Sequence, residues 1–305
     1  MPVLACLNGE IMPVEQAKVS VWDRGFVFGD SVYEVFRMYQ GRCWLEEEHL
    51  ARLKRSLKEL DFAPHDLVGM MRRIYRTIAA SGIKEGTLYV QITRGVAPRS
   101  HPFPDPPVHP TEVIIVRPYD DRPTARLRQS GVTMISQPDL RWKRCDIKST
   151  NLLANVLAIE AAKRAGAFEA VLVDADGLVT EATHTSLIWT REGRLEGTPE
   201  GHEILPGLTR RLVLELITNL EIPFASSRVR LDELKQVDEL ILVGTTTEVV
   251  SVVRVDGAVI GTGQPGPIAR RLHQAYEAAV ARWLAGSATD RAVPAPSASG
   301  QADGG

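Results

Sequence analysis

A polar stretch at residues 117–124 divides the 305-residue chain into two parts, in which strand-like and helix-like hydrophobic patterns mix. The stretch holds two prolines and four charged side chains, and it follows neither the two-residue period of a strand nor the 3.6-residue period of a helix. A chain of this length is enough for about two domains. We therefore predict a smaller first domain at residues 1–117, an interdomain linker at 118–130 and a larger second domain at 131–286.

Hydrophobic periodicity predicts the elements of each part. In the first part we expect two short strands around Asn8 and Gly9, and the remaining elements are helices at 46–60 and 66–81 and strands at 88–92 and 113–116. In the second part we expect strands at 132–136, 168–174 and 187–190, a hairpin across 240–255, and helices at about 151–166, 208–220 and 267–283. This mixture predicts the α/β (α+β) class. Residues 287–305 are rich in small and polar residues and are predicted to be disordered.

Composition narrows the class of protein. A net charge of −2 and a pI near 6.4 give no reason to expect binding to nucleic acid or to an anionic membrane. Cys6, Cys43 and Cys145 are widely spaced, which indicates a reducing compartment rather than disulfides, and the seven histidines show no metal-ligand spacing. The N-terminus does not read as a signal peptide, and no apolar run is long enough to span a bilayer. We expect a cytoplasmic globular protein without a metal site.

Lys148 is the first candidate for chemistry. It lies between the apolar Ile147 and a helix start that Ser149, Thr150 and Asn151 predict. A lysine that attacks a carbonyl must lose its proton, and partial burial lowers the pKa of such an amine. Schiff-base chemistry with pyridoxal phosphate needs this lysine and also a carboxylate that keeps the pyridine nitrogen protonated. A solvent-facing lysine is the alternative for any single lysine.

Two segments offer anchors for a phosphate. Arg52 stands three residues after His49, so both lie on one side of the helix at 46–60. Gly207 begins the helix at 208–220, whose free N–H groups and the Thr209 hydroxyl can bind an anion. Threonines at 245–247 place further hydroxyls at a strand end. The alternatives are a solvated arginine, an ordinary helix start and a threonine-rich strand.

Two loops complete the set of motifs. Arg99 and His101 lie in a loop with three prolines and are well arranged to hold a carboxylate, although a merely polar loop is the alternative. Residues 261–266 fit the pattern G-x-G-x-x-G before a helix. No strand or acidic residue follows at the spacing of a dinucleotide site, so we interpret this segment as the exit from a hairpin.

Together these segments resemble the class IV aminotransferases, the fold-type IV pyridoxal-phosphate enzymes, and within that class the D-amino-acid (D-alanine) transaminases. The likeness runs from about Asn8 to Trp283. Five segments carry it in the order of the family: 23–35, 91–95, 98–101, 144–149 and 204–210. The resemblance implies two domains, of which the larger is an α/β pseudobarrel that binds the cofactor.

The resemblance also implies roles for single residues. Lys148 is the Schiff-base lysine, and Glu181 is the partner of the pyridine nitrogen. The implied phosphate ligands are Arg52, the backbone amides of Leu208 and Thr209, and the Thr245 hydroxyl. The implied substrate ligands are Tyr33 near the carboxylate, and Arg99 with His101 as a carboxylate trap supplied across a dimer interface. Residues 182–186 depart from the small turn of the relatives, so Thr183, His184 and Thr185 are assigned no role.

The expected protein is a homodimeric D-amino-acid transaminase that uses pyridoxal 5′-phosphate and acts on amino acids and 2-oxo acids. Branched-chain L-transaminases and aminodeoxychorismate lyases share the lysine and the glutamate, but branched-chain transaminases lack the Arg-x-His pair. A catalytically silent binding protein on the same fold is the alternative from outside the enzymes.

Overall fold

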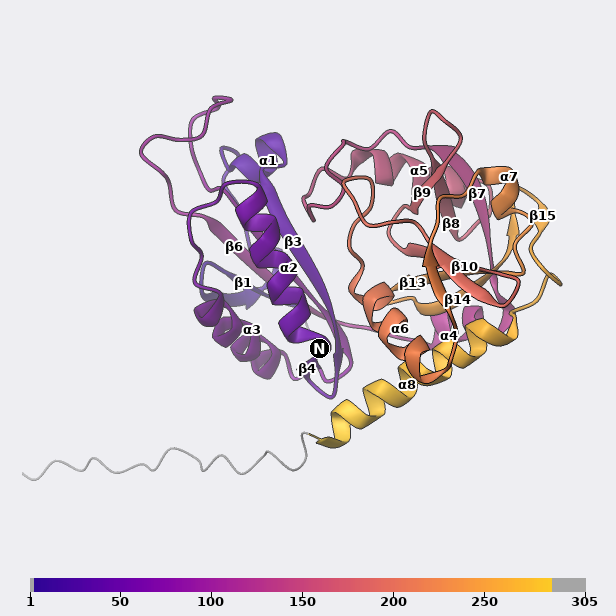
Figure 1. Cartoon of the computed structure of the whole chain (residues 1–305). Helices are drawn as coiled ribbons and strands as arrows, with labels where there is room; N and C mark the ends of the chain where they lie inside the picture. Colours follow the sequence, from indigo (N-terminus) through magenta and orange to yellow (C-terminus); the bar gives the residue numbers. More distant parts are fainter. Residues whose placement is uncertain (1–2, 287–305) are drawn as a thin grey trace, which may run out of the picture.

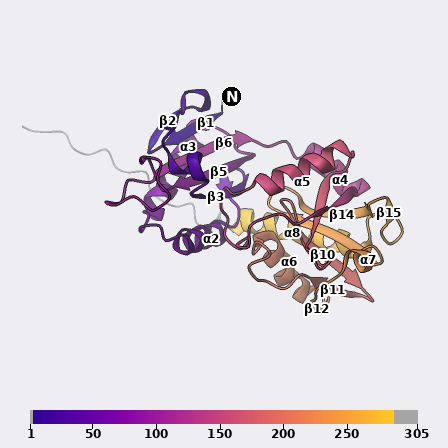
Figure 2. The ribbon, with the colours of Figure 1, turned by 90° about the horizontal axis from the view of Figure 1, so that it is seen from above.

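The computed structural model describes residues 3–286, in two parts that lie side by side (Figures 1 and 2). The predicted tail at 287–305 lies outside the described residues. Each part is built on its own sheet, and we propose that the two parts are separate domains. Within residues 3–286 no helix is long and apolar enough to cross a membrane.

The first part is a six-stranded sheet with helices against it. Neighbouring strands are all antiparallel, in the order β2-β1-β6-β5-β3-β4. The strands are β1 (Leu4–Leu7), β2 (Glu10–Pro13), β3 (Ser31–Tyr39), β4 (Arg42–Cys43), β5 (Gly86–Thr93) and β6 (Thr111–Pro118). The helices are the short η1 (Val14–Gln16) and α1 (Arg24–Phe28), and the longer α2 (Glu46–Glu59) and α3 (Leu67–Ser81).

Hydrophobic spacing explains how α2 and α3 cover this sheet. Leu53 of α2 and Met70 and Ile74 of α3 are fully buried against Phe36 of β3 and Leu88 of β5. Helical side chains three or four residues apart share one face, so Met70 and Ile74 lie on the same apolar stripe of α3. The helices predicted at 46–60 and 66–81 are thereby confirmed within two residues.

The second part is a nine-stranded sheet that curls on itself. Its path is β12-β11-β10-β13-β14-β7-β8-β9, with β15 paired to β14, and β9 at the end of the path comes back into contact with β10. The strands are β7 (Val132–Pro138), β8 (Glu169–Val173), β9 (Val179–Ala182), β10 (Ser186–Arg191), β11 (Arg194–Gly197), β12 (Phe224–Ser226), β13 (Glu239–Gly244), β14 (Glu248–Val255) and β15 (Ala258–Val259). This closure agrees with the expected pseudobarrel.

Helices cover the outside of the curled sheet. They are α4 (Arg122–Ser130), α5 (Leu153–Arg164), α6 (Leu208–Asn219), α7 (Leu231–Leu234) and α8 (Pro267–Gly286). Helix α5 packs on β7 and β8, α4 packs on β14, and α6 and α8 pack on each other and on β13. The segment predicted as an interdomain linker, 118–130, holds a helix that the sequence did not predict, since α4 occupies most of its length. Pro123 suits the first turn of a helix, and Arg128 ties α4 to Glu248.

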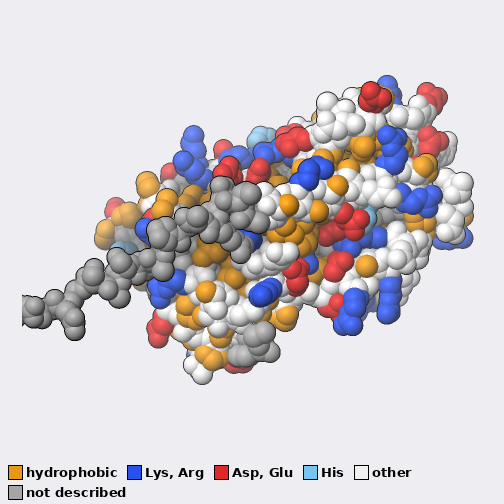
Figure 3. All heavy atoms as spheres, turned by 90° about the horizontal axis from the view of Figure 1, so that it is seen from below, with side chains coloured by type: hydrophobic (Ala, Val, Ile, Leu, Met, Phe, Trp, Pro, Cys, Tyr) orange, Lys and Arg blue, Asp and Glu red, His pale blue; other side chains and the backbone are white. Residues whose placement is uncertain are grey.

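Helix α8 joins the two parts. Near its end, the Trp283 ring lies 5.0 Å from Trp44 of the first part, and the Arg42 guanidinium lies 4.2 Å above the same indole. Tyr276 meets Trp44 from the same helix, at 6.1 Å between ring centroids. On the face seen from below, acidic and basic side chains are interspersed over both parts (Figure 3).

Candidate active site

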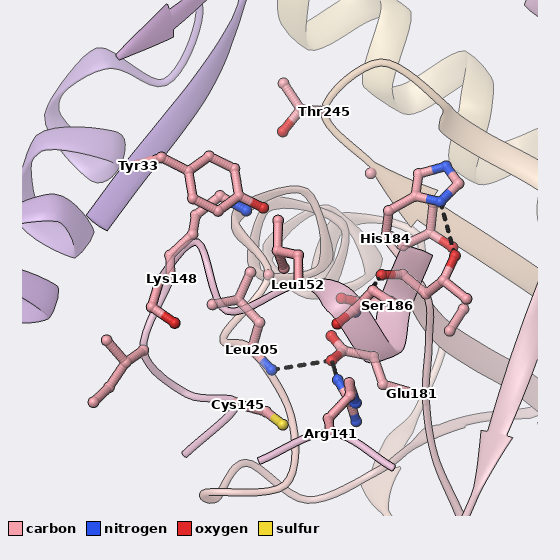
Figure 4. Close-up of a pocket in the computed structure, with 18 of the residues that line it drawn as sticks. Tyr33, Arg141, Cys145, Lys148, Leu152, Glu181, His184, Ser186, Leu205 and Thr245 are labelled. Carbon is pink, nitrogen blue, oxygen red and sulfur yellow. Dashed lines mark hydrogen bonds and ion pairs between the residues drawn. The ribbon is translucent and has the colours of Figure 1, made fainter. Parts of the chain in front are cut away.

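A cavity of about 350 Å³ lies where the two parts meet, and its walls come from elements far apart in the sequence. Seven of the nine predicted site residues line it: Tyr33, Arg52, Lys148, Glu181, Leu208, Thr209 and Thr245. In Figure 4, Lys148 and Tyr33 lie together on one side, and Glu181 lies on the opposite side with Arg141 and Leu205.

The backbone at Lys148 is held by strand β3. The Tyr33 N–H donates to the Lys148 carbonyl at 3.0 Å, the Thr150 N–H donates to the Ser31 carbonyl at 3.2 Å, and Ser149 forms an isolated bridge with Val32. Because these bonds extend the β3 ladder by one short segment, the position of Lys148 is set by the first part of the chain.

Those hydrogen bonds correct one prediction. The side chains of Ser149, Thr150 and Asn151 do not cap α5, whose N-cap is Leu152 and has no side-chain capping bond. The Thr150 hydroxyl instead bonds to the Ser31 hydroxyl, which joins the two parts. Polar residues that resemble a helix cap therefore serve a tertiary contact at this point.

The side chain of Lys148 faces the cavity. It is partly buried, and its Nζ lies 4.4 Å from the centre of the Tyr33 ring, which in turn stacks on Tyr89 at 5.7 Å. Within residues 3–286, the structure gives Nζ no carboxylate partner. The Lys148 amine thus lies against the Tyr33 ring and forms no ion pair with a described residue.

Glu181 is a buried carboxylate with one occupied oxygen. Its Oε2 accepts hydrogen bonds from Arg141 Nη1 at 2.7 Å and from the Leu205 N–H at 3.3 Å, and among the described residues Oε1 has no partner. Burial raises the pKa of Glu181 above its ordinary value, against the opposing effect of the Arg141 guanidinium. A protonated pyridine nitrogen would supply a hydrogen-bond donor for Oε1, beside the guanidinium that already pairs with Oε2.

Arg141 was not predicted as a site residue. Asp139 accepts from its Nε and Nη2 at 2.9 and 2.8 Å, and the Glu203 carbonyl accepts from Nη2 at 2.9 Å. These bonds fix the guanidinium, so that Arg141 holds Glu181 in one orientation. The only signal in the sequence was its place seven residues before Lys148.

The N-terminus of α6 forms the opposite wall. Gly207 is the N-cap, and Leu208 and Thr209 contribute the first free N–H groups of the helix. A Cβ at Gly207 would lie 2.5 Å from the Ser186 Oγ, so a larger residue would fit only if the serine side chain or the start of α6 shifted. Helix N-termini of this kind bind anions through their N–H groups and the helix dipole.

Arg52 reaches the same wall from α2. Its Nε and Nη2 donate to Glu34 at 2.7 and 2.8 Å, and Nη1 donates to the Pro206 carbonyl at 3.0 Å. His49 meets the same carboxylate at 2.7 Å, which explains why both polar residues lie on the buried face of α2. Although burial opposes it, Arg52 and His49 hold the pKa of Glu34 well below its usual range. A guanidinium has five N–H donors, so two remain for an anion.

A second arginine supports the fit to a phosphate. Arg210, which is 3% exposed, donates from Nη2 to the Thr198 carbonyl at 2.6 Å. Its Nε and Nη1 are buried without a hydrogen-bond partner in the described chain, and Nη1 lies 4.0 Å from Glu200. Burial lowers the pKa of Arg210. Incompletely paired cationic donors beside the α6 N-terminus suit a dianion, so the residues present fit a phosphorylated cofactor.

Residues 183–185 are organised by a buried carboxylate that the sequence did not reveal. Glu169, fully buried in β8, accepts from the Thr183 N–H at 3.1 Å and from the Thr185 hydroxyl at 3.2 Å. It also pairs with His184 Nδ1 at 2.8 Å. The departure from the small turn of the relatives is therefore an ordered hydrogen-bonded turn that lines the cavity.

The remaining two predicted site residues lie elsewhere. Arg99 and His101 are exposed on the loop between β5 and β6, and they do not line the cavity of their own chain. In Figure 1 this loop leaves the end of the small part and does not approach the second part.

Comparisons with known proteins add an independent observation. A family model described as amino-transferase class IV matches residues 31–255. The D-alanine aminotransferase of Staphylococcus epidermidis is 40% identical over 275 residues, which cover 89% of this chain and 95% of the relative. That of Bacillus licheniformis is 37% identical over 274 residues, with 88% and 94% covered.

Solved structures show the same architecture. The branched-chain amino acid aminotransferase of Escherichia coli aligns with a TM-score of 0.84 at 26% identity, over 90% of this chain and 93% of that chain. A hypothetical aminotransferase from Mycobacterium tuberculosis, in its PLP-bound form, aligns with a TM-score of 0.79 at 24% identity, over 92% of this chain and 99% of that chain.

Proposed function

The chain belongs to the class IV aminotransferases, which depend on pyridoxal 5′-phosphate, and from this premise we propose that it is a D-amino-acid transaminase. It transfers the amino group of a D-amino acid of the D-alanine type to a 2-oxo acid such as 2-oxoglutarate or pyruvate. The observation that carries this proposal is the 37–40% identity to D-alanine aminotransferases over almost the whole folded chain.

When bound, the cofactor supplies an aldehyde for covalent attachment to an amine and a pyridine ring that withdraws electrons from the bonds around the amino nitrogen. We assign its attachment to Lys148. The α6 N-terminus with Leu208 and Thr209, together with Arg52, would bind the phosphate, and Thr245 would add its hydroxyl. Support comes from the cavity, which brings these groups together from four elements of the fold.

Proton movement is assigned to Lys148 and Glu181. A free Lys148 amine beside Tyr33 would take the proton from the substrate Cα and pass it to the cofactor. Glu181 Oε1 would hold a proton on the ring nitrogen, with Arg141 keeping the carboxylate in place. Tyr33 and the aliphatic side chains that line the cavity would shield the reacting atoms from water once substrate is bound.

We propose that the substrate carboxylate is bound by Arg99 and His101 of a second copy of the chain, with Tyr33 beside it. The proposal explains why both residues are exposed and remote from the cavity of their own chain. Large exposed hydrophobic side chains near the loop and at the cavity support a homodimer, among them Phe26 of α1, at 72% exposure, and Val156 of the cavity lining, at 54%. We further propose a cytoplasmic location, which agrees with three free cysteines.

A branched-chain L-amino-acid transaminase is the second candidate, because solved branched-chain enzymes share the fold at TM-scores of 0.77–0.84. The test is a panel of D- and L-amino acids with 2-oxoglutarate or pyruvate as acceptor, followed by detection of the new amino acid. The D-transaminase proposal expects D-alanine and other D-amino acids to react. Preference for L-leucine, L-isoleucine or L-valine would transfer the assignment to the second candidate.

A further inference from the structure

One buried arginine grips the backbone of the loop that carries Arg99 and His101. Arg24 of α1 is 4% exposed. Its Nη1 donates to the carbonyls of Ser100 at 2.6 Å and Pro102 at 3.3 Å, and its Nη2 donates to the carbonyl of His101 at 3.2 Å. A single guanidinium thus holds three consecutive carbonyls, which fixes the course of the chain through His101.

The same face of α1 also contacts the side chains of this loop. Phe28 stands four residues after Arg24, and the Arg24 guanidinium stacks on its ring at 4.8 Å. The Arg99 guanidinium lies 5.4 Å from the centre of the Phe28 ring, and the His101 ring lies 5.5 Å from it. Arg24 therefore holds the loop backbone, while Phe28 supports both of its functional side chains.

Helix α1 is itself fixed to the strands on either side of the loop. Asp23, its N-cap, is 1% exposed. Its Oδ2 accepts from the Thr93 hydroxyl at the end of β5, at 3.0 Å, and from the Thr111 hydroxyl at the start of β6, at 2.6 Å. Helix α1, which we call the platform, is thus tied to the strands at both ends of the loop whose backbone Arg24 holds.

The charge of Arg24 is balanced within this platform. Its Nε pairs with Asp30 at 2.8 Å, and Arg94 pairs with the same carboxylate at 2.9 Å. Asp30 would consequently keep one cationic partner if Arg24 were replaced. This arrangement makes the role of Arg24 testable without leaving a buried carboxylate unpaired.

We propose that Arg24 is a positioning residue for substrate binding. It orders the loop before substrate arrives, so that Arg99 and His101 are presented together to the carboxylate. The inference rests on the proposed function, in which those two side chains bind the carboxylate in the neighbouring subunit. Ordering an exposed loop and its long side chains in advance removes a cost that binding would otherwise carry.

The test uses Arg24→Lys, Arg99→Ala and wild-type holoenzyme. Lysine keeps the positive charge but lacks the planar fork that reaches three carbonyls. We expect Arg24→Lys to raise the KM of both D-alanine and pyruvate about tenfold, with kcat changed less than about twofold and cofactor content unchanged. Limited trypsin digestion gives a readout independent of activity, since a released loop should be cleaved faster after Arg99.

Two further variants make the test specific. Arg37→Lys is the matched control, because Arg37 is equally buried at 4% and donates to backbone carbonyls of the same part, but it contacts nothing in the loop. Phe28→Leu tests the platform without removing a buried charge. It should raise both KM values about two- to fivefold, through loss of the exposed cation–π contact between Phe28 and Arg99. Phe28→Leu also keeps the inference testable if the Arg24→Lys protein does not fold.

The outcomes separate the inference from the proposed function. If Arg99→Ala raises KM while Arg24→Lys and Phe28→Leu both keep wild-type KM and trypsin resistance, the role of Arg24 is refuted and the carboxylate assignment stands. An equal rise in Arg37→Lys would likewise refute a specific role for Arg24. If wild-type protein does not transaminate D-amino acids, or if Arg99→Ala is fully active, the proposed function itself fails.

Discussion

Replacement of Gly207 by alanine tests the assignment of the α6 N-terminus as the phosphate site. The φ angle of Gly207 is −69°, so alanine fits the backbone without strain, and the effect is steric alone. The new Cβ would lie 2.5 Å from the Ser186 Oγ, and ordinary contact begins at 3.4 Å, so a separation of 0.9 Å (3.4 − 2.5) must be gained.

This displacement falls partly on the Leu208 and Thr209 N–H groups and partly on the Ser186 side chain. A shift of about 1 Å in positioning groups can cost up to about a hundredfold, and rotation of the serine relieves part of the clash. We therefore expect the cofactor to bind about tenfold more weakly, which corresponds to about 1.4 kcal/mol.

The assay is titration of the cofactor-free protein with pyridoxal 5′-phosphate, followed by visible absorbance. Gly201→Ala is the control, because a Cβ at Gly201 meets nothing within 4 Å. Adding Ser186→Ala to Gly207→Ala should restore most of the affinity relative to Ser186→Ala alone. Unchanged affinity in Gly207→Ala, or no recovery in the double variant, would refute the reasoning.

The remaining predictions concern charged residues. Glu34→Gln should lower the free energy of unfolding by about 3–5 kcal/mol at pH 7, since it leaves Arg52 buried without its carboxylate. Because the folded-state pKa of Glu34 is depressed, the carboxylate stabilises the fold fully above its unfolded-state pKa of about 4.3, and this contribution is lost as the pH falls below that value. The free energies of unfolding of the two proteins, measured by urea titration, should therefore converge as the pH is lowered. Glu181→Gln should retain cofactor but lower kcat together with kcat/KM, because an amide cannot hold a proton on the ring nitrogen, and a wild-type kcat in steady-state assays would exclude this role. Arg99→Ala should lower kcat/KM about ten- to a hundredfold for every substrate, by the loss of one charge-assisted hydrogen bond. Mixing it with Lys148→Ala protein should restore part of the activity in heterodimers, and a fully active monomer would contradict the shared site.

The sequence predicted the main helices and most of the longer strands because their hydrophobic periods are long and regular. It missed α4, whose residues 122–130 include a single large aliphatic side chain, Leu127, and thus show no apolar stripe. The strands β3, β9 and β11 were also missed. β9 and β11 have four residues each and carry little periodic signal, whereas β3 has buried side chains on both faces and so lacks a clean two-residue alternation.

The lining residues of the site were predicted from motifs, whereas the charges that hold them were not. Glu34 and Glu169 are buried and Arg141 is partly buried, and the partners of all three come from other segments of the chain. No spacing rule relates such partners, because the fold alone brings them into contact. The role of Arg24 could not be predicted from the sequence for the same reason, since 76 residues separate it from the Ser100 carbonyl to which it donates.

The most direct test of the central claim is the identity of the residue that carries the cofactor. The holoenzyme would be reduced with borohydride, digested, and mapped by mass spectrometry. We predict a phosphopyridoxyl label on Lys148 and loss of that label in Lys148→Ala. A label on another lysine, or no label after addition of pyridoxal 5′-phosphate, would contradict the account.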